Sequence, residues 1–197
     1  MLKIGITGGI GSGKTTACRL FEKLGVPVYY ADARAGFIQN NDPALIESIK
    51  QLFGEGIYIN GSLDRQSLGK IVFSDKSKLD ALNNLVHPAV FKDAQDWQEK
   101  QRLAGAAYTL KEAALLFETG SYKSLDKIIV VSAPLELRIE RVMSRDNLSK
   151  AEVLKRIGNQ MPQEEKEKLA DFILYNINLV DLQKEVEKLH KIILENC

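Results

Sequence analysis

The chain has few of the residues from which metal centres and disulfide frameworks are built. Among 197 residues there are two cysteines, Cys18 and Cys197, which lie far apart and have no metal-type spacing. The two histidines, His87 and His190, have no ligand-type neighbour in the sequence. We therefore expect no zinc site. Cys18 is expected to be a small core residue rather than a reactive thiol.

Excess charge, long apolar runs and repeats are also missing. The 27 basic and 26 acidic side chains leave a net charge of +1, so no overall field attracts nucleic acid or an anionic membrane. No apolar run approaches transmembrane length, and Met1 leads into a strand pattern without a secretory apolar segment. We expect a cytoplasmic protein of one domain, residues 1–197, with lobes inserted in it and no membrane or nucleic-acid partner.

Short apolar runs alternate with helical patterns, which is typical of an α/β fold. Five of these runs have the length and composition of buried strands, and together they predict a five-stranded parallel sheet. They are residues 2–7, 26–30, 107–113, 127–132 and 172–175.

The connection between the second and third predicted strands is unusually long. It has about 75 residues, whereas a parallel crossover needs about a dozen. Helical patterns at 43–53, 64–73, 75–85 and 88–103 predict a mostly helical insert, residues 32–104. A second helical pair, 134–145 and 149–159, is rich in arginine and predicts a lid, residues 134–162, that closes over phosphates.

The strongest motif follows the first strand. Residues 8–15 read Gly-Gly-Ile-Gly-Ser-Gly-Lys-Thr, a complete P-loop of the form G-x-x-x-x-G-K-[ST] between a strand and a helix pattern. Backbone N–H groups from Gly11, Ser12 and Gly13 onward would point at a triphosphate, assisted by the positive end of the helix. Lys14 would reach the outer phosphates and Thr15 would offer a hydroxyl to Mg²⁺. The alternative is an ordinary glycine-rich turn.

Two acidic residues lie near the carboxyl ends of predicted strands, where ligands of parallel sheets bind. Asp32 would lie beside the P-loop if the second strand neighbours the first. It could accept a proton from an attacking hydroxyl, order water around Mg²⁺, or simply cap a helix. Glu118 ends the run Leu115-Leu116-Phe117, where its charge must be used in a site or paired in the structure.

The remaining candidates lie on predicted helices. Arg138, Arg141 and Arg145 are spaced so that one helix face can present all three to phosphate, or to solvent. His87 precedes Pro88, which favours extended geometry at a helix start. His190 has charged neighbours, and we expect it on the surface without a catalytic role. The apolar stripe of the last helix is expected to pack on the sheet; it consists of Leu179, Leu182, Val186, Leu189 and Ile193.

Taken together, these motifs resemble the dephospho-CoA kinase family over nearly the whole chain. The P-loop is shared by many enzymes, whereas Ala31-Asp32 with Leu63-Asp64-Arg65 and His87-Pro88 is far more selective. The other matching segments are residues 5–15, 24–28, 72–73, 115–118, Arg141, 145–146, 156–157, Gln160, 170–171 and Asn176.

The resemblance implies a three-layer P-loop kinase fold with a helical acceptor-binding insert and a helical lid. It implies transfer of the γ-phosphoryl group of ATP, with Mg²⁺, to the ribose 3′-hydroxyl of dephospho-CoA, the last step of coenzyme A synthesis. Catalysis would fall to Asp32, Lys14 and Arg141, and acceptor binding to Asp32, Arg65, His87 and Glu118. ATP would contact Gly11, Ser12, Gly13, Lys14, Thr15, Thr16, Arg141 and Asn176, with Thr15 also at the metal.

The sequence departs from the family at three points. The family's arginine four residues after the aspartate is Gly36 here, and the nearest arginine is Arg34; Ala114 replaces a proline, and Tyr175 replaces the aspartate of an Asp-Asn pair. Two other functions stay open on the residues alone. One is a small P-loop kinase with another hydroxyl acceptor, and the other is a nucleotide-dependent switch, although no N-K-x-D or D-x-x-G segment is present.

Overall fold

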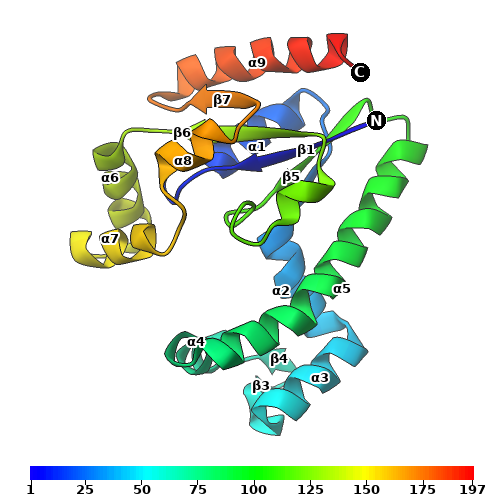
Figure 1. Ribbon diagram of the computed structural model, residues 1–197, viewed down its shortest axis with the longest axis vertical. Coiled ribbons are helices and arrows are strands. Elements are labelled where there is room, and N and C mark those ends of the chain that lie inside the picture. Colours follow the sequence, from blue (N-terminus) through cyan, green and yellow to red (C-terminus); the bar gives the residue numbers. More distant parts are fainter. The chain divides into compact units, whose positions relative to one another are not determined.

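The five apolar runs form one parallel sheet. The computed structural model describes all 197 residues, and its sheet has the order β2-β5-β1-β6-β7 (Figure 1). Each strand is paired in parallel with its neighbours, so the predicted five-stranded parallel sheet is confirmed. The strands are β1 (Leu2–Thr7), β2 (Val28–Tyr30), β5 (Tyr108–Glu112), β6 (Lys127–Ser132) and β7 (Phe172–Tyr175).

The neighbours of β1 are β5 and β6, not β2. In the registers, Ile4 lies opposite Leu110, and Leu110 in turn lies opposite Val28. The prediction that Asp32 lies beside the P-loop depended on the condition that the second strand neighbours the first. That condition is therefore wrong. Burial explains the order: all residues of β5 are buried, as suits an interior strand, whereas β2 has three residues and is half-buried at an edge.

The chain divides into two units, which we call the sheet unit (residues 1–30 and 98–197) and the inserted unit (residues 31–97). In the sheet unit, α1 and α9 supply side chains to the main core together with β1, β5 and β6. Cys18 is fully buried in this core, as predicted, and Gly25 ends α1 with a positive φ of 83°. The helices of this unit are α1 (Lys14–Lys23), α6 (Leu135–Asp146), α7 (Lys150–Gly158), α8 (Gln163–Lys168) and α9 (Leu179–Glu195), with the 3-10 turn η2 (Ser121–Ser124).

The stripe of α9 packs on the core as predicted, except at its first residue. Leu182, Val186, Leu189 and Ile193 are buried there, whereas Leu179 is 58% exposed. The prediction of a surface position for His190 is wrong. Its ring is half-buried, and Nδ1 lies 2.7 Å from the hydroxyl oxygen of the buried Tyr108, because α9 covers β5 at this point.

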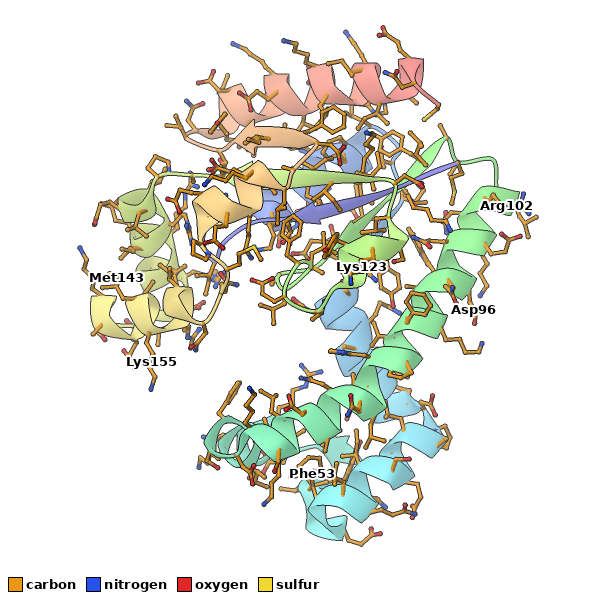
Figure 2. The ribbon with its side chains drawn as sticks, viewed as in Figure 1. Phe53, Asp96, Arg102, Lys123, Met143 and Lys155 are labelled. Atoms are coloured by element: carbon orange, nitrogen blue, oxygen red, sulfur yellow. The ribbon has the colours of Figure 1, made fainter.

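The inserted unit has its own apolar core, to which residues from 38 to 86 contribute, and Phe53 packs against it (Figure 2). Aspartates cap two of its helices through backbone N–H groups: Asp42 before α3 and Asp64 before α4. The helices are α2 (Ala31–Asn41), α3 (Pro43–Phe53), α4 (Arg65–Ser74) and α5 (Lys76–Leu103), with the 3-10 turn η1 (Glu55–Ile57).

A small antiparallel hairpin lies within this helical unit and was not predicted. Strands β3 (Tyr58–Ile59) and β4 (Ser62–Leu63) are joined by Asn60 and Gly61, both with positive φ, of 50° and 78°. An Asn-Gly pair at such a turn is a strong hairpin signal. The flanking strands have only two residues each, too few for an alternating pattern to be visible in the sequence.

Helix α5 runs unbroken through Pro88, whereas the sequence suggested two helices. Proline removes one hydrogen bond to the carbonyl four residues earlier, that of Asn84. Because Asn84 is exposed, water can satisfy that carbonyl, while the buried stripe Leu82, Val86 and Ala94 continues across the proline. His87 is consequently helical rather than extended. Neither α5 nor any other helix is long and apolar enough to cross a membrane.

The α9 stripe predicts a contrast between two leucines. Leu182→Ala should lower the free energy of unfolding by about 2–5 kcal/mol, because the truncation leaves a cavity in the main core. Leu179→Ala, at an exposed position of the same helix, should change it by less than about 0.5 kcal/mol. Urea unfolding followed by circular dichroism measures both, and equal losses would contradict the packing of α9 described above.

Candidate active site

The P-loop connects β1 to α1 with a backbone that glycine makes possible. Gly11 and Gly13 have φ values of 78° and 92°, which L side chains rarely adopt. Gly13 is the N-cap of α1 and offers no side chain to cap it. The first N–H groups of a helix have no partner within the helix, so those of Lys14, Thr15 and Thr16 can bind an anion together with the helix dipole.

Three side chains of the loop point to the same ligand class. The Lys14 ammonium donates to the carbonyl oxygen of Gly8 at 2.9 Å, and this bond closes the loop on itself. Ser12 is fully buried, and its hydroxyl has no hydrogen-bond partner. The Thr15 hydroxyl belongs to an exposed residue in the first turn of α1. A cation, N–H groups and hydroxyls in one loop are the donor set of a phosphate site.

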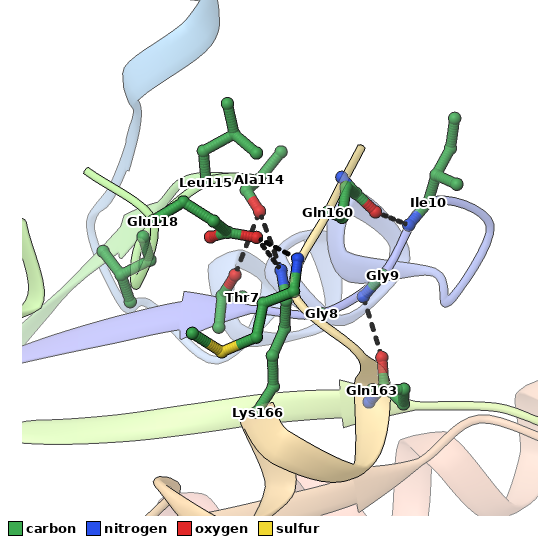
Figure 3. A network of polar contacts seen from close by, with 12 residues as sticks. Thr7, Gly8, Gly9, Ile10, Ala114, Leu115, Glu118, Gln160, Gln163 and Lys166 are labelled. Atoms are coloured by element: carbon green, nitrogen blue, oxygen red, sulfur yellow. Dashed lines mark hydrogen bonds and ion pairs between the residues drawn. The ribbon is translucent and has the colours of Figure 1, made fainter. Parts of the chain in front are cut away.

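The outer side of the P-loop is held by two glutamines near the N-terminus of α8 (Figure 3). The Gln163 side-chain oxygen accepts the N–H of Gly9 at 2.9 Å. The Gln160 side-chain oxygen accepts the N–H of Ile10 at 2.8 Å. These two N–H groups are thereby used in the fold. The Ser12 N–H is used as well, because it donates to the carbonyl oxygen of Gly9 at 3.1 Å. A phosphate is left with the N–H groups of Gly11, Gly13 and the first turn of α1.

Arg138 and Asn176 hold the same loop through its carbonyl groups. Arg138 Nε donates to the Ile10 oxygen at 3.0 Å, and Asn176 Nδ2 donates to the Ser12 oxygen at 2.8 Å. Both side chains are buried. A Cβ atom on Gly13 would collide with the Asn176 amide, so close approach as well as backbone conformation requires glycine there. A contact between Asn176 and adenine stays a prediction.

The three spaced arginines of α6 have three different environments, and they do not present one common guanidinium face. Arg138 lies buried against the P-loop, and burial lowers the pKa of its guanidinium, opposed by the charges of nearby glutamates. Arg141 donates to the carbonyl oxygens of residues 176 and 177, which follow β7. Arg145 is exposed and pairs with Asp146 at 2.7 Å. The helices α6 and α7, which the sequence predicts to form a lid, share a small core that includes Val142 and Val153, while Lys155 points outward from α7 (Figure 2).

Glu118 forms the structural pair that was one of its two interpretations. Its Oε1 lies 2.9 Å from Nζ of Lys166, which is completely buried, and accepts the N–H of Met161 at 2.8 Å (Figure 3). Burial raises the pKa of the Glu118 carboxyl, but these two hydrogen bonds together hold it below its ordinary value. A contact of Glu118 with an acceptor stays a prediction.

Glu112 is a candidate that the sequence reasoning missed. It is the last residue of β5, only 7% exposed, and lies opposite Ile6 of β1 in the register. Burial raises the pKa of the Cys18 thiol, and the negative charge of Glu112 raises it further, whereas the positive charge of Lys14 lowers it. The charges of Glu112 and Lys14 therefore act on the same part of α1. The signal was a carboxylate near the end of a buried strand, but the predicted strand 107–113 placed Glu112 inside it. Asp32 was considered instead, on the condition that β2 neighbours β1.

Asp32, Arg65 and His87, the expected acceptor-side residues, all belong to the inserted unit. Asp32 is exposed in the first turn of α2, Arg65 begins α4 after its Asp64 cap, and His87 is exposed on α5. Their roles toward an acceptor stay predictions.

The departure at Gly36 has a structural counterpart. A Cβ atom on Gly36 would collide with Nη2 of Arg65, so the guanidinium of Arg65 lies against the bare backbone of α2. Arg34 does not fill this place. Its guanidinium forms a bidentate pair with Asp93, at 2.9 and 2.6 Å, and lies over the ring of Phe37. The missing side chain at position 36 therefore makes room for Arg65.

Comparison with known proteins identifies the family. A family model for dephospho-CoA kinase matches residues 2–181, which include every candidate residue above. The chain belongs to the dephospho-CoA kinase family. A curated dephospho-CoA kinase of Chlorobium luteolum is 40% identical over 98% of this chain and 90% of that protein.

Solved structures agree with this family assignment. A protein of Thermus thermophilus superimposes with a TM-score of 0.84 at 40% identity, covering 99% of this chain and 97% of that chain. A dephospho-CoA kinase from Campylobacter jejuni gives 0.75 at 31% identity and covers 98% of both chains. As a member of the dephospho-CoA kinase family, the chain is a kinase, and its α/β fold is that of P-loop kinases.

The packing of Arg65 on Gly36 predicts an effect specific to one substrate. If Arg65 binds the acceptor as predicted, Gly36→Ala should raise the KM for dephospho-CoA by about tenfold, because the new methyl group displaces the guanidinium and each charge-assisted hydrogen bond is worth about 1.5–3 kcal/mol. The KM for ATP should not change. Since alanine favours helices more than glycine does, impaired folding should not cause the effect.

Gly56→Ala is the matched control, because a Cβ atom at Gly56 meets open space in the same unit. Steady-state kinetics with each substrate varied in turn measures both variants. A KM for dephospho-CoA equal to that of the unaltered enzyme in Gly36→Ala would contradict an acceptor role for Arg65.

Proposed function

We propose that the protein transfers the γ-phosphoryl group of ATP to the ribose 3′-hydroxyl of dephospho-CoA, giving coenzyme A and ADP. The proposal rests on the family match over residues 2–181 and on a P-loop that leads directly into the N-terminus of α1, where backbone N–H groups can bind phosphate. Both substrates are small molecules. The reaction is the last step of coenzyme A synthesis, and we propose that the protein carries it out in the cytoplasm.

The P-loop supplies binding energy and electrostatic stabilisation at the phosphates. The N–H groups of Gly11, Gly13 and the first turn of α1 bind the phosphate oxygens, and Lys14 exchanges its bond with the Gly8 carbonyl for the outer phosphates. The donor set fits Mg²⁺, which prefers oxygen: the Thr15 hydroxyl at the loop and the Glu112 carboxylate at the end of the adjacent strand would hold it. When bound, Mg²⁺ neutralises charge on the transferring phosphoryl group.

The inserted unit binds the acceptor in this proposal. Asp32 is exposed at the start of α2, and its carboxylate accepts the proton of the 3′-hydroxyl as that oxygen attacks. Arg65 and His87 contact dephospho-CoA, and Arg65 is supported by the space that Gly36 leaves for it. Chain connectivity favours a role for Asp32, because it follows the sheet strand β2 by two residues.

The lid excludes water during transfer. Arg141 already contacts the carbonyl groups after β7, and its guanidinium binds the nucleotide as the charge on the phosphates redistributes. Arg145 and Arg156 both pair with Asp146, which joins the ends of α6 and α7. Closure of the lid protects ATP from hydrolysis when no acceptor is bound.

An acceptor panel tests the reaction. Purified protein with ATP and Mg²⁺ should release ADP rapidly with dephospho-CoA, and at least about 100-fold more slowly with nucleoside monophosphates or shikimate, because only the correct acceptor satisfies the polar groups of the site. Equal rates with a nucleoside monophosphate would favour another P-loop kinase. ADP release that no acceptor stimulates would favour a nucleotide-dependent switch.

The base role of Asp32 predicts a separation of binding from turnover. Asp32→Asn should lower kcat by about 10² to 10⁴, because the amide cannot accept the proton. The affinity for ADP should stay unchanged, because Asp32 is not part of the P-loop. Asp80→Asn, at an exposed aspartate of α5, is the matched control. Lys14→Ala should instead weaken ADP binding itself. Turnover close to that of the unaltered enzyme in Asp32→Asn would exclude the base role.

A further inference from the structure

The P-loop is shaped by a segment that lies about 150 residues later in the chain. Gln160 and Gln163 bind the N–H groups of Ile10 and Gly9, and Lys166 anchors the helix that carries Gln163 (Figure 3). A glycine-rich loop has many accessible conformations, and ordering it costs more entropy than ordering any other sequence. Whatever selects the conformation that receives phosphate therefore contributes to nucleotide affinity.

The amide of Gln163 can bind Gly9 in only one orientation. Its Nε2 donates to Oε1 of Glu167 at 3.2 Å and faces the carbonyl oxygen of Val131 at 3.4 Å. Glu167 is itself fixed, because the hydroxyl of Ser132 donates to the same Oε1 at 2.6 Å. With acceptors on the nitrogen side, the Gln163 oxygen must face the N–H of Gly9, and the side chain is buried in that position.

Lys166 fixes the helix from the other side. Its ammonium is completely buried and contacts Oε1 of Glu118 at 2.9 Å and the carbonyl oxygen of Ala114 at 3.3 Å. The same Glu118 oxygen accepts the N–H of Met161, so one carboxylate holds both ends of the segment 161–166. The Thr7 hydroxyl, at the end of β1, also contacts the Ala114 oxygen, at 3.5 Å.

Stability alone does not account for a buried lysine at this position. Desolvating an ammonium costs several kcal/mol, and a well-packed apolar residue in place of a buried ion pair is often neutral or stabilising. The ion pair instead fixes a position, because the buried ammonium needs both the Glu118 carboxylate and the Ala114 carbonyl oxygen as partners. This sets the place of α8, and with it the place of the Gln163 oxygen.

We propose that Gln163 and Lys166 are positioning residues that hold the P-loop in its phosphate-receiving conformation before the nucleotide arrives. Neither needs to touch ATP, since Gln163 acts through Gly9 and Lys166 acts through α8. The inference rests on the proposed function only in that the P-loop binds a nucleotide. It adds two residues outside the P-loop to the determinants of nucleotide affinity.

The test measures ADP binding by titration calorimetry, without an acceptor. Gln163→Leu should weaken ADP binding by about tenfold, because it leaves the Gly9 N–H without its acceptor and the loop without its restraint. Lys166→Met should weaken it similarly while the unfolding temperature stays within a few degrees of that of the unaltered protein, and Lys166→Arg should restore much of the affinity. The matched controls, Gln183→Leu and Lys168→Met, change exposed residues of α9 and α8 and should bind ADP normally.

Normal ADP affinity in a folded Gln163→Leu or Lys166→Met protein would overturn the proposal, and so would a loss that Lys166→Arg does not relieve. If either variant does not fold, amide hydrogen exchange of the unaltered protein decides. Protected N–H groups at Gly9 and Ile10 in the absence of nucleotide support the inference, and rapid exchange there overturns it. ADP binding without phosphorylation of dephospho-CoA would refute the proposed function alone.

Discussion

A phosphate site made of backbone N–H groups depends on the conformation of a few glycines. Gly11 and Gly13 adopt positive φ values that free those N–H groups, but the same freedom allows the loop many other shapes. Four side chains restrict the loop by hydrogen bonds to its outward-facing peptide groups: Gln160, Gln163, Arg138 and Asn176. The inner surface is then left to the ligand, and preorganisation of this kind lowers the entropy that nucleotide binding must overcome.

Local signals in the sequence predicted local structure well. The P-loop, the helical pattern at residues 43–53 and the buried stripe of α9 depend on neighbours within a turn or two, so their residue types suffice to identify them. Pro88 shows where a local rule fails, because an apolar stripe that continues across it keeps α5 whole. The Asn60-Gly61 turn carried a usable signal, but its strands are too short to show a pattern.

The parts of the candidate site that the sequence did not predict depend on strand order or on partners far away in the chain. The residues of β2 and β5 do not indicate which of these strands pairs with β1. The pairing with β5 makes Glu112, and not a residue that follows β2, the carboxylate at the end of the strand next to β1. Gln163 and Lys166 lie in a short charged stretch with no motif of its own. Their importance follows from partners about 50 and 150 residues away, which only the folded chain brings together.

The place of β5 between β1 and β2 also bears on how the chain folds. β1 is made first, yet its neighbours β5 and β6 follow only after the inserted unit, so the centre of the sheet closes through contacts of large sequence separation. Such loop closure slows folding. During synthesis the inserted unit can assemble around its own core while β1 still lacks partners. The P-loop motif therefore leaves the ribosome long before Gln160 and Gln163, and it can acquire their restraint only after that later segment has been made.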